Sequence, residues 1–87
     1  MPKLKQDEDY GIGENLVRMR KNKKLMQKHV IAQLGQYGIH ISRNTYSKME
    51  HNNYPIKVKE LMALALIFDC KDFNDFFTGV QYPEKLV

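Results

Sequence analysis

Hydrophobic side chains recur at helical spacing along most of this 87-residue chain, with polar residues between them. Within residues 10–24, for example, Ile12, Leu16 and Met19 occupy positions i, i+4 and i+7, which form one face of an amphipathic helix. Similar patterns predict four further helices, over residues 26–37, 41–50, 57–68 and 72–78. No alternation of apolar and polar residues is long enough to predict a strand. The pattern therefore predicts an all-α fold, a compact bundle of five helices.

Residues with strong capping preferences stand at the expected ends of these helices. Ser42 precedes the third helix and Asp72 precedes the last, and both residue types are favoured N-caps. Gly38 follows the second helix and Gly79 follows the last, and glycine readily takes the left-handed conformation that ends many helices. Asn52, after the third helix, is one of the few non-glycine residue types that tolerate this conformation.

The fourth and fifth predicted helices are strongly apolar, and we expect them to supply much of the core. Residues 57–68 are predicted to form the central core helix. Its predicted buried face consists of Val58, Leu61, Ala65 and Phe68, with Met62 and Leu64 beside it. The last helix contributes Phe73, Phe76 and Phe77, which are either core residues or, in part, a surface for self-association.

Length and composition predict a single small domain. We expect a flexible N-terminus over residues 1–8, a folded domain over residues 9–79 and a tail over residues 80–87. Cys70 is the only cysteine, so no intramolecular disulfide can form, and a reducing cytoplasm is the simplest location. We expect neither a secretory signal nor a membrane span, because the charged start and the short apolar runs fit neither.

Positive charge is concentrated in the middle of the chain. Lys and Arg outnumber Asp and Glu by 14 to 10 overall, which gives a formal net charge of +4. Residues 10–60 hold ten of these bases and only three of the acids, so this segment alone carries +7. Such a distribution favours a polyanionic partner, although a solvated basic surface without a partner is the alternative.

The third predicted helix, residues 41–50, has two faces of opposite character. Tyr46 and Met49 fall on an apolar face beside Ile41, and this face can anchor in a core. The opposite face carries Arg43, Asn44, Ser47 and Lys48. Their side chains can donate to base edges and phosphates, and a helix fits a major groove about 12 Å wide. An ordinary solvated helix surface is the competing interpretation.

The sequence gives no support to catalysis. No nucleophile stands with a base and an orienting group, and Gly11-Ile12-Gly13 lacks the preceding strand and third glycine of a dinucleotide-binding loop. His29, His40 and His51 are not accompanied by cysteine or carboxylate ligands at metal-site spacing. We therefore expect neither an enzyme nor a bound metal or cofactor.

Several residues together form a pattern that resembles the Cro/repressor-like helix-turn-helix family, also called the xenobiotic-response-element family of regulators. The matching residues are Gln27, Ala32, Leu34, Ser42, Arg43, Asn44, Thr45 and Glu50. The resemblance extends from about Ile12 to Phe77. The link between Leu34 and Ser42 exceeds the family's usual turn and resembles a variant with an extended second helix. Asn52 stands where the family usually has glycine.

The resemblance implies a bundle of the lambda-repressor type, in which the second and third helices form the helix-turn-helix and residues 42–50 enter the major groove. The residues implied in reading bases are Arg43, Asn44, Ser47, Lys48 and Thr45. Those implied in phosphate contacts are Gln27, Ser42, His51, Asn52, Asn53 and Lys57, and Gln27 could also brace Arg43. Arg20 and Glu50 would form a structural salt bridge that orients the reading helix.

These observations predict a sequence-specific DNA-binding transcriptional regulator of the repressor type. A module of this size reads few base pairs, so we expect a homodimer on a palindromic operator with half-sites about 34 Å apart. The predicted dimer surface involves the fourth and fifth helices. One alternative is an antitoxin or anti-repressor that uses the same fold to hold a protein partner. Another is a nucleic-acid-binding protein without sequence preference.

Overall fold

The computed structural model describes residues 11–80. Its α-helices are α1 (Gly13–Asn22), α2 (Gln27–Gln36), α3 (Arg43–Glu50) and α4 (Val58–Ile67), followed by the 3₁₀ helix η1 (Phe73–Phe77). No strand occurs between residues 11 and 80, so the predicted all-α class is confirmed for this part of the chain. The predicted flexible segment 1–8 lies outside the described residues, as does the predicted tail 80–87 apart from Val80.

The prediction of five α-helices is wrong, because the described residues contain four. The fifth predicted helix is the 3₁₀ helix η1, which is only five residues long. Asp72 caps it as expected, since its carboxylate accepts from the backbone N–H of Asn74 at 2.9 Å. The segment then ends at Gly79, which has a φ of +75°. So short a segment favours the tighter i→i+3 hydrogen bonds of a 3₁₀ helix over an α-helix.

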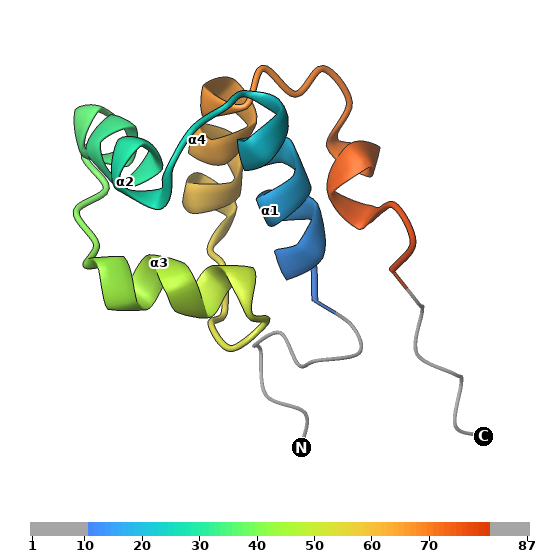
Figure 1. Cartoon of the computed structure of the whole chain (residues 1–87), viewed down its shortest axis with the longest axis horizontal. Coiled ribbons are helices and arrows are strands. Elements are labelled where there is room, and N and C mark those ends of the chain that lie inside the picture. Colours follow the sequence, from blue (N-terminus) through green and yellow to red (C-terminus); the bar gives the residue numbers. More distant parts are fainter. Residues whose placement is uncertain (1–10, 81–87) are drawn as a thin grey trace.

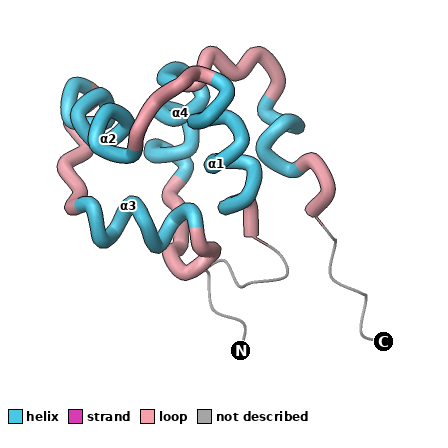
Figure 2. Tube along the Cα trace, in the orientation of Figure 1, coloured by secondary structure: helices cyan, strands magenta, loops and turns pink. Residues whose placement is uncertain are grey.

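The helices pack as a bundle in which α3 lies across one end. α2 contacts both α3 and α4, whereas α1 contacts α3 and η1. Figure 1 shows α2 and α3 next to one another on one side, α1 beyond α4, and η1 outermost beside α1. Figure 2 shows the extended links between successive helices. The predicted helix-turn-helix pair, α2 and α3, is therefore at one edge of the molecule.

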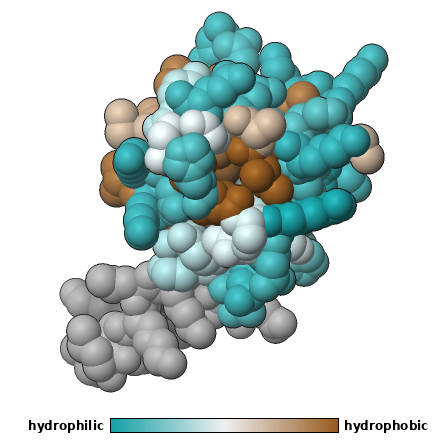
Figure 3. Space-filling model, turned by 90° about the vertical axis from the view of Figure 1, so that its left-hand side faces the viewer, coloured by the Kyte–Doolittle hydropathy of each residue, from teal (hydrophilic) through white to brown (hydrophobic). Residues whose placement is uncertain are grey.

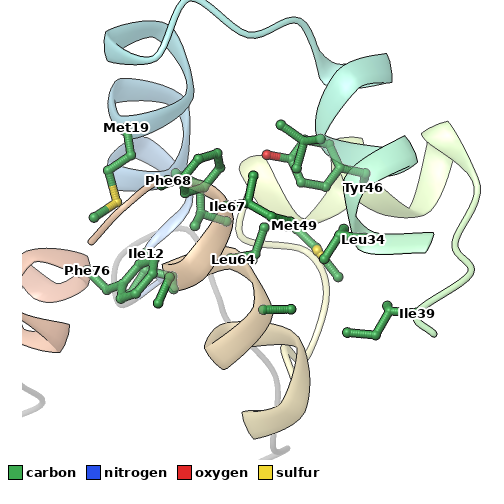
Figure 4. Packing of buried hydrophobic residues seen from close by; sticks show 14 residues of the cluster. Ile12, Met19, Leu34, Ile39, Tyr46, Met49, Leu64, Ile67, Phe68 and Phe76 are labelled. Atoms are coloured by element: carbon green, nitrogen blue, oxygen red, sulfur yellow. The ribbon is translucent and has the colours of Figure 1, made fainter. Parts of the chain in front are cut away.

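The core anchors α3 through two side chains. Tyr46 and Met49 are completely buried, as the pattern of the third helix predicted. Figure 4 shows both side chains pointing from α3 into a cluster with Leu34 of α2 and Leu64 of α4. Burying one such apolar side chain contributes about 1.5 to 3 kcal/mol, so rotating α3 about its axis would be costly. This anchorage determines which residues of α3 face outward.

The predicted buried face of α4 is partly wrong. Val58 is 74 % exposed, and two further apolar residues of this helix, Met62 and Leu66, also face outward. The buried apolar residues of α4 and its C-cap are Ala63, Leu64, Ala65, Ile67 and Phe68. Because residues 61–67 are all apolar, their periodicity cannot indicate which side faces the core.

The aromatic residues of η1 divide between core and surface. Phe76 is completely buried, whereas Phe73 and Phe77 are about half exposed. The buried Asn15 of α1 holds η1 in place, because its Nδ2 donates to the carbonyl oxygens of Phe76 at 2.7 Å and Thr78 at 3.0 Å. A buried amide that satisfies two carbonyl groups is a specific link between α1 and η1.

All four α-helices end in the same way, with a left-handed residue and a six-to-one hydrogen bond. The left-handed residues are Lys24, Gly38, Asn52 and Asp69. The closing bonds run from the N–H of Leu25, Ile39, Asn53 and Cys70 to carbonyl oxygens in the last helical turn. These features define the Schellman motif. The expected roles of Gly38 and Asn52 are thus confirmed.

Replacing Lys24 by glycine should stabilise the fold. Lys24 has a φ of 58°, where a side chain with a Cβ costs roughly 1 kcal/mol relative to glycine. We therefore expect Lys24→Gly to raise the free energy of unfolding by about 1 kcal/mol in urea titrations. Lys23→Gly is the matched control, because Lys23 has an ordinary φ of −88° and glycine there should destabilise the chain. Equal effects of the two substitutions would contradict this explanation.

Candidate nucleic-acid interface

The outward face of α3 carries most of the predicted base-reading residues. Ser42 is the N-cap, and its hydroxyl oxygen accepts from the backbone N–H of Thr45 at 3.1 Å. Arg43, Asn44 and Lys48 are exposed, whereas Thr45 and Ser47 are half-buried. The structure therefore exposes Arg43 and Asn44 of the first helical turn and Lys48 of the second turn on one accessible surface. The Ser42 hydroxyl also donates to Thr45 Oγ1 at 3.1 Å, which fixes the Thr45 side chain.

Three helices meet at the carboxylate of Glu50, the last residue of α3. Arg20 of α1 donates to it from Nε at 2.7 Å and from Nη2 at 3.2 Å. Gln27, the first residue of α2, donates from Nε2 at 2.9 Å. Arg20 also donates from Nη1 to the carbonyl oxygen of Leu25 at 3.0 Å. The Arg20–Glu50 salt bridge expected from the resemblance is therefore present. Gln27 of α2 also binds the Glu50 carboxylate.

The electrostatics of this cluster favour the ionised pair. Burial opposes ionisation of Glu50, but the hydrogen bonds from Arg20 and Gln27 outweigh it, so the pKa of Glu50 is lowered. The hydrogen bond to Glu50 raises the pKa of Arg20 against the opposite effect of burial. The side chain of Glu50 is only 3 % exposed, compared with 13 % for Arg20. Solvent therefore screens this ion pair weakly.

The hydroxyl of Tyr46 lies beside the same cluster. Its oxygen is buried and forms no hydrogen bond of standard geometry with the described residues. Burial first, and then the adjacent Glu50 carboxylate, as an acceptor and as a negative charge, raise the pKa of this hydroxyl above its ordinary value of 10. Tyr46 therefore stays protonated at physiological pH, and its ring anchors α3 while its hydroxyl faces the charged pair.

Gln27 has a different contact from the one expected. The side-chain amide of Gln27 donates to Glu50 and not to Arg43, so the expected contact between Gln27 and Arg43 is not supported. The second amide proton of Gln27 remains for another acceptor, and a phosphate at the N-terminus of α2 is one such acceptor. The hydrogen bond from Gln27 to Glu50 thus links the start of α2 to the end of α3.

The loop after α3 is joined to the start of α1. Asn52 has a φ of 59°, and its side-chain oxygen accepts from the backbone N–H of Gly13 at 2.6 Å. The half-buried Asn52 thereby satisfies one of the unpaired N–H groups at the N-terminus of α1. Asn52 therefore has a structural role in this loop, and its predicted phosphate contact stays a prediction.

The other predicted phosphate-binding residues of this loop are accessible. His51, Asn53 and Lys57 are all exposed. The ring Nδ1 of His51 lies 2.7 Å from the carbonyl oxygen of Ser47, which holds the imidazole against the last turn of α3. These residues extend the polar surface of α3 toward the start of α4.

Sequence reasoning missed two buried arrangements that support this surface. Added methyl groups at Gly11 or Gly13 would overlap Asn52, and at Gly13 also the backbone of Glu50, so the start of α1 lies directly against the end of α3. Glu60 is buried and accepts from the backbone N–H of Lys57 at 2.8 Å. A glutamate three residues after an N-cap is a recognisable capping pattern, so the role of Glu60 could have been predicted.

No family model matches this chain, and no curated protein or solved structure is significantly similar to it. The likeness to helix-turn-helix regulators thus rests on the motif residues themselves. Among the helices formed by residues 11–80, none has the length and hydropathy that crossing a lipid bilayer requires.

Proposed function

We propose that this chain is a sequence-specific DNA-binding transcriptional regulator of the repressor type that inserts the outer face of α3 into the major groove. The observation that carries the proposal is the fixed orientation of α3. Buried Tyr46 and Met49 hold one face, and Glu50 ties its end to α1 and α2. The remaining face is polar, basic and accessible. A rigid helix that presents donors outward suits direct readout of base edges.

The chemistry of this face assigns roles to its first turn. The guanidinium of Arg43 can donate two parallel hydrogen bonds to O6 and N7 of guanine, and the amide of Asn44 can pair with N6 and N7 of adenine. Lys48 lies one turn further on and can reach either a base or a phosphate. Two or three such contacts specify only a short half-site. A homodimer on a palindromic operator would supply the rest.

Non-specific attraction would come from the basic middle of the chain. Residues 10–60 carry ten bases against three acids. The exposed side chains of Asn53 and Lys57 flank the end of α3 and would contact phosphates, which fix the register without reading sequence. Counterion release from these contacts makes binding depend steeply on salt concentration.

A second candidate function is an antitoxin or anti-repressor that holds another protein. The observation that favours it is the exposure of apolar side chains on α4, where Val58 and Leu66 are 74 % and 64 % exposed. Selection from a random duplex library separates the two, because a DNA reader enriches one sequence with a defined symmetry.

Replacing Arg43 by alanine should weaken binding to the selected site by roughly 1 to 3 kcal/mol and relax the choice of one base pair. Fluorescence anisotropy with matched and singly altered duplexes measures both effects. Lys57→Ala is the matched control, because loss of a phosphate contact should weaken all duplexes alike and reduce the salt slope by about one unit. Unchanged affinity and base preference in Arg43→Ala would show that α3 is not the reading helix. A wild-type protein without sequence preference would support the non-specific alternative.

A further inference from the structure

Two exposed histidines, at the end of α3 and the start of α2, carry their imidazole protons on opposite ring nitrogens. Nδ1 of His51, the C-cap of α3, lies 2.7 Å from the carbonyl oxygen of Ser47. A carbonyl oxygen can only accept a hydrogen bond, so this Nδ1 carries a proton. In the first turn of α2, Nδ1 of His29 accepts from the backbone N–H of Met26 at 3.0 Å, so this nitrogen carries none. Neutral His51 is therefore the Nδ1–H tautomer, and neutral His29 is the Nε2–H tautomer.

The two tautomers offer different groups to a phosphate. Neutral His29 has an N–H at Nε2, which can donate to an anion without a change of charge. Neutral His51 has only a lone pair at Nε2, and a lone pair repels a phosphate oxygen. His51 can donate from Nε2 only after it has gained a second proton and become an imidazolium. The predicted phosphate contact of His51 therefore requires a proton.

A second proton is compatible with the fold at His51 but not at His29. The hydrogen bond from Nδ1 of His51 to Ser47 is made in both charge states, and the negative end of the α3 dipole favours a cation there. At His29 a second proton would occupy the nitrogen that accepts from Met26, and the positive end of the α2 dipole opposes it. His51 is therefore the better placed of the two to carry charge in a complex with DNA.

The segments that meet at His51 carry other titratable groups. The end of α3 lies against the start of α1, and the loop after it leads to α4 (Figure 1). These segments carry Glu14, Lys48, Glu50, Tyr54, Lys57, Lys59 and Glu60. The buried carboxylates of Glu50 and Glu60 already accept hydrogen bonds within the fold. The exposed Lys48 and Lys57 oppose a further positive charge at His51, and phosphates bound along this surface would offset that repulsion.

We propose that His51 binds a DNA phosphate as an imidazolium, so that each copy of the chain takes up a proton from solvent when it binds DNA at neutral or higher pH. The inference rests on the proposed function, because α3 in a major groove brings the phosphate backbone to the end of that helix. Figure 3 shows hydrophilic side chains around a smaller apolar area on the side where α2 and α3 lie, a surface that a charged backbone can approach. Imidazole gains and loses its charge between about pH 5 and 8, so affinity for DNA would vary with pH near neutrality.

Fluorescence anisotropy of the whole chain on a labelled random-sequence DNA duplex tests this linkage, because phosphate contacts do not depend on sequence. At equal salt the wild type should bind roughly tenfold more tightly at pH 6 than at pH 8, the effect expected of one charge-assisted hydrogen bond. The plot of log affinity against log salt concentration should also be steeper at pH 6 by about one unit, because one more phosphate is neutralised.

Three substitutions separate His51 from the general rise in positive charge at low pH. His51→Gln should lose most of the pH dependence of both affinity and salt slope. His51→Lys, which is always charged, should bind at pH 8 about as tightly as the wild type does at pH 6. His29→Gln is the matched control, because it removes another exposed histidine while glutamine can still accept from the N–H of Met26, and its pH dependence should be that of the wild type. Circular dichroism must show unaltered helix content in each variant at both pH values.

Nuclear magnetic resonance of the imidazole nitrogens tests the tautomers without any substitution. In the free wild-type chain at pH 8, His51 should carry its proton on Nδ1 and His29 on Nε2. Three results would overturn the inference: a proton on Nε2 of neutral His51, a His51→Gln variant with the wild-type pH dependence, and an equal loss of that dependence in His29→Gln.

The same measurements distinguish this inference from the proposed function. Binding to DNA that is equally tight at pH 6 and pH 8 would overturn the role of His51 and leave the proposed function standing. Proton-linked binding with no preference among duplexes would support the role of His51 and contradict sequence-specific reading. A chain that binds no duplex at either pH would refute both.

Discussion

Replacing Glu50 by alanine should lower the free energy of unfolding by roughly 3 kcal/mol. The substitution removes the acceptor of hydrogen bonds from Arg20 and Gln27 and leaves the guanidinium without its counterion. Removal of one partner of a buried pair costs about 3 to 5 kcal/mol, and the 13 % exposure of the Arg20 side chain favours the lower value. In a domain of this size the melting temperature should fall by roughly 12 to 24 °C.

The effect of Glu50 should depend on pH in a defined direction. The pKa of Glu50 is lower in the folded chain than its ordinary value of 4.5. Its ionised form therefore stabilises the fold fully above pH 4.5, and this contribution disappears as the pH falls through the lower pKa of the folded state. The stability difference between wild type and Glu50→Ala should accordingly be constant near neutrality and shrink in acid.

Thermal unfolding followed by circular dichroism at pH 7 and in acid measures both effects. Glu14→Ala is the matched control, because it removes the same charge from an exposed position in the first turn of α1 and should cost only about 0.5 kcal/mol. Below its melting temperature, Glu50→Ala should also bind the selected DNA more weakly, since α3 loses its tie to α1 and α2. Tighter binding would indicate that the negative charge acts directly on DNA rather than through orientation.

The sequence predicts α3 and its surroundings well because the relevant information there is local. Ser42 is an N-cap, Tyr46 and Met49 share an apolar face, and Asn52 adopts the left-handed conformation. Each of these follows from residue type and helical period within a few positions. The outward direction of Arg43 is then a consequence of the buried face.

The sequence fails where long-range packing decides between local alternatives. Residues 61–67 are apolar on every side, so only the positions of the other helices determine that Leu64 is buried while Leu66 is exposed. Asn15 looks like an ordinary polar helix residue, yet it bonds to carbonyl groups more than 60 positions away. η1 became a 3₁₀ helix because its short length, rather than its apolar pattern, governs its hydrogen bonding.

The close approach of α1 to the end of α3 is another long-range feature. It reverses the expected effect of Gly13→Ala on stability. Helix propensity alone predicts that Gly13→Ala in α1 stabilises the chain by up to about 1 kcal/mol. Gly13 is buried, however, and an added methyl would overlap the carbonyl group of Glu50 and the side chain of Asn52. The Glu50 carbonyl belongs to the backbone of α3 and cannot rotate away as a side chain could.

We therefore expect Gly13→Ala to destabilise the fold by roughly 2 to 3 kcal/mol, which is typical of forced overpacking. Gly35→Ala is the matched control. Gly35 lies in α2, and an added methyl there would meet only the His40 ring at 3.7 Å, which is ordinary contact. Gly35→Ala should therefore stabilise the chain by about 1 kcal/mol through helix propensity. Urea unfolding of both variants tests the opposite signs.

Binding measurements on Gly13→Ala connect this packing to the proposed function. Relief of the overlap requires the end of α3 to move away from α1, which would also strain the hydrogen bond from Gly13 to Asn52 and the position of Glu50. Arg43 at the other end of α3 would then be displaced, so affinity for the selected duplex should fall even under conditions where the variant is fully folded. Stabilisation by Gly13→Ala equal to that by Gly35→Ala would show that α1 and α3 are not in close contact in solution.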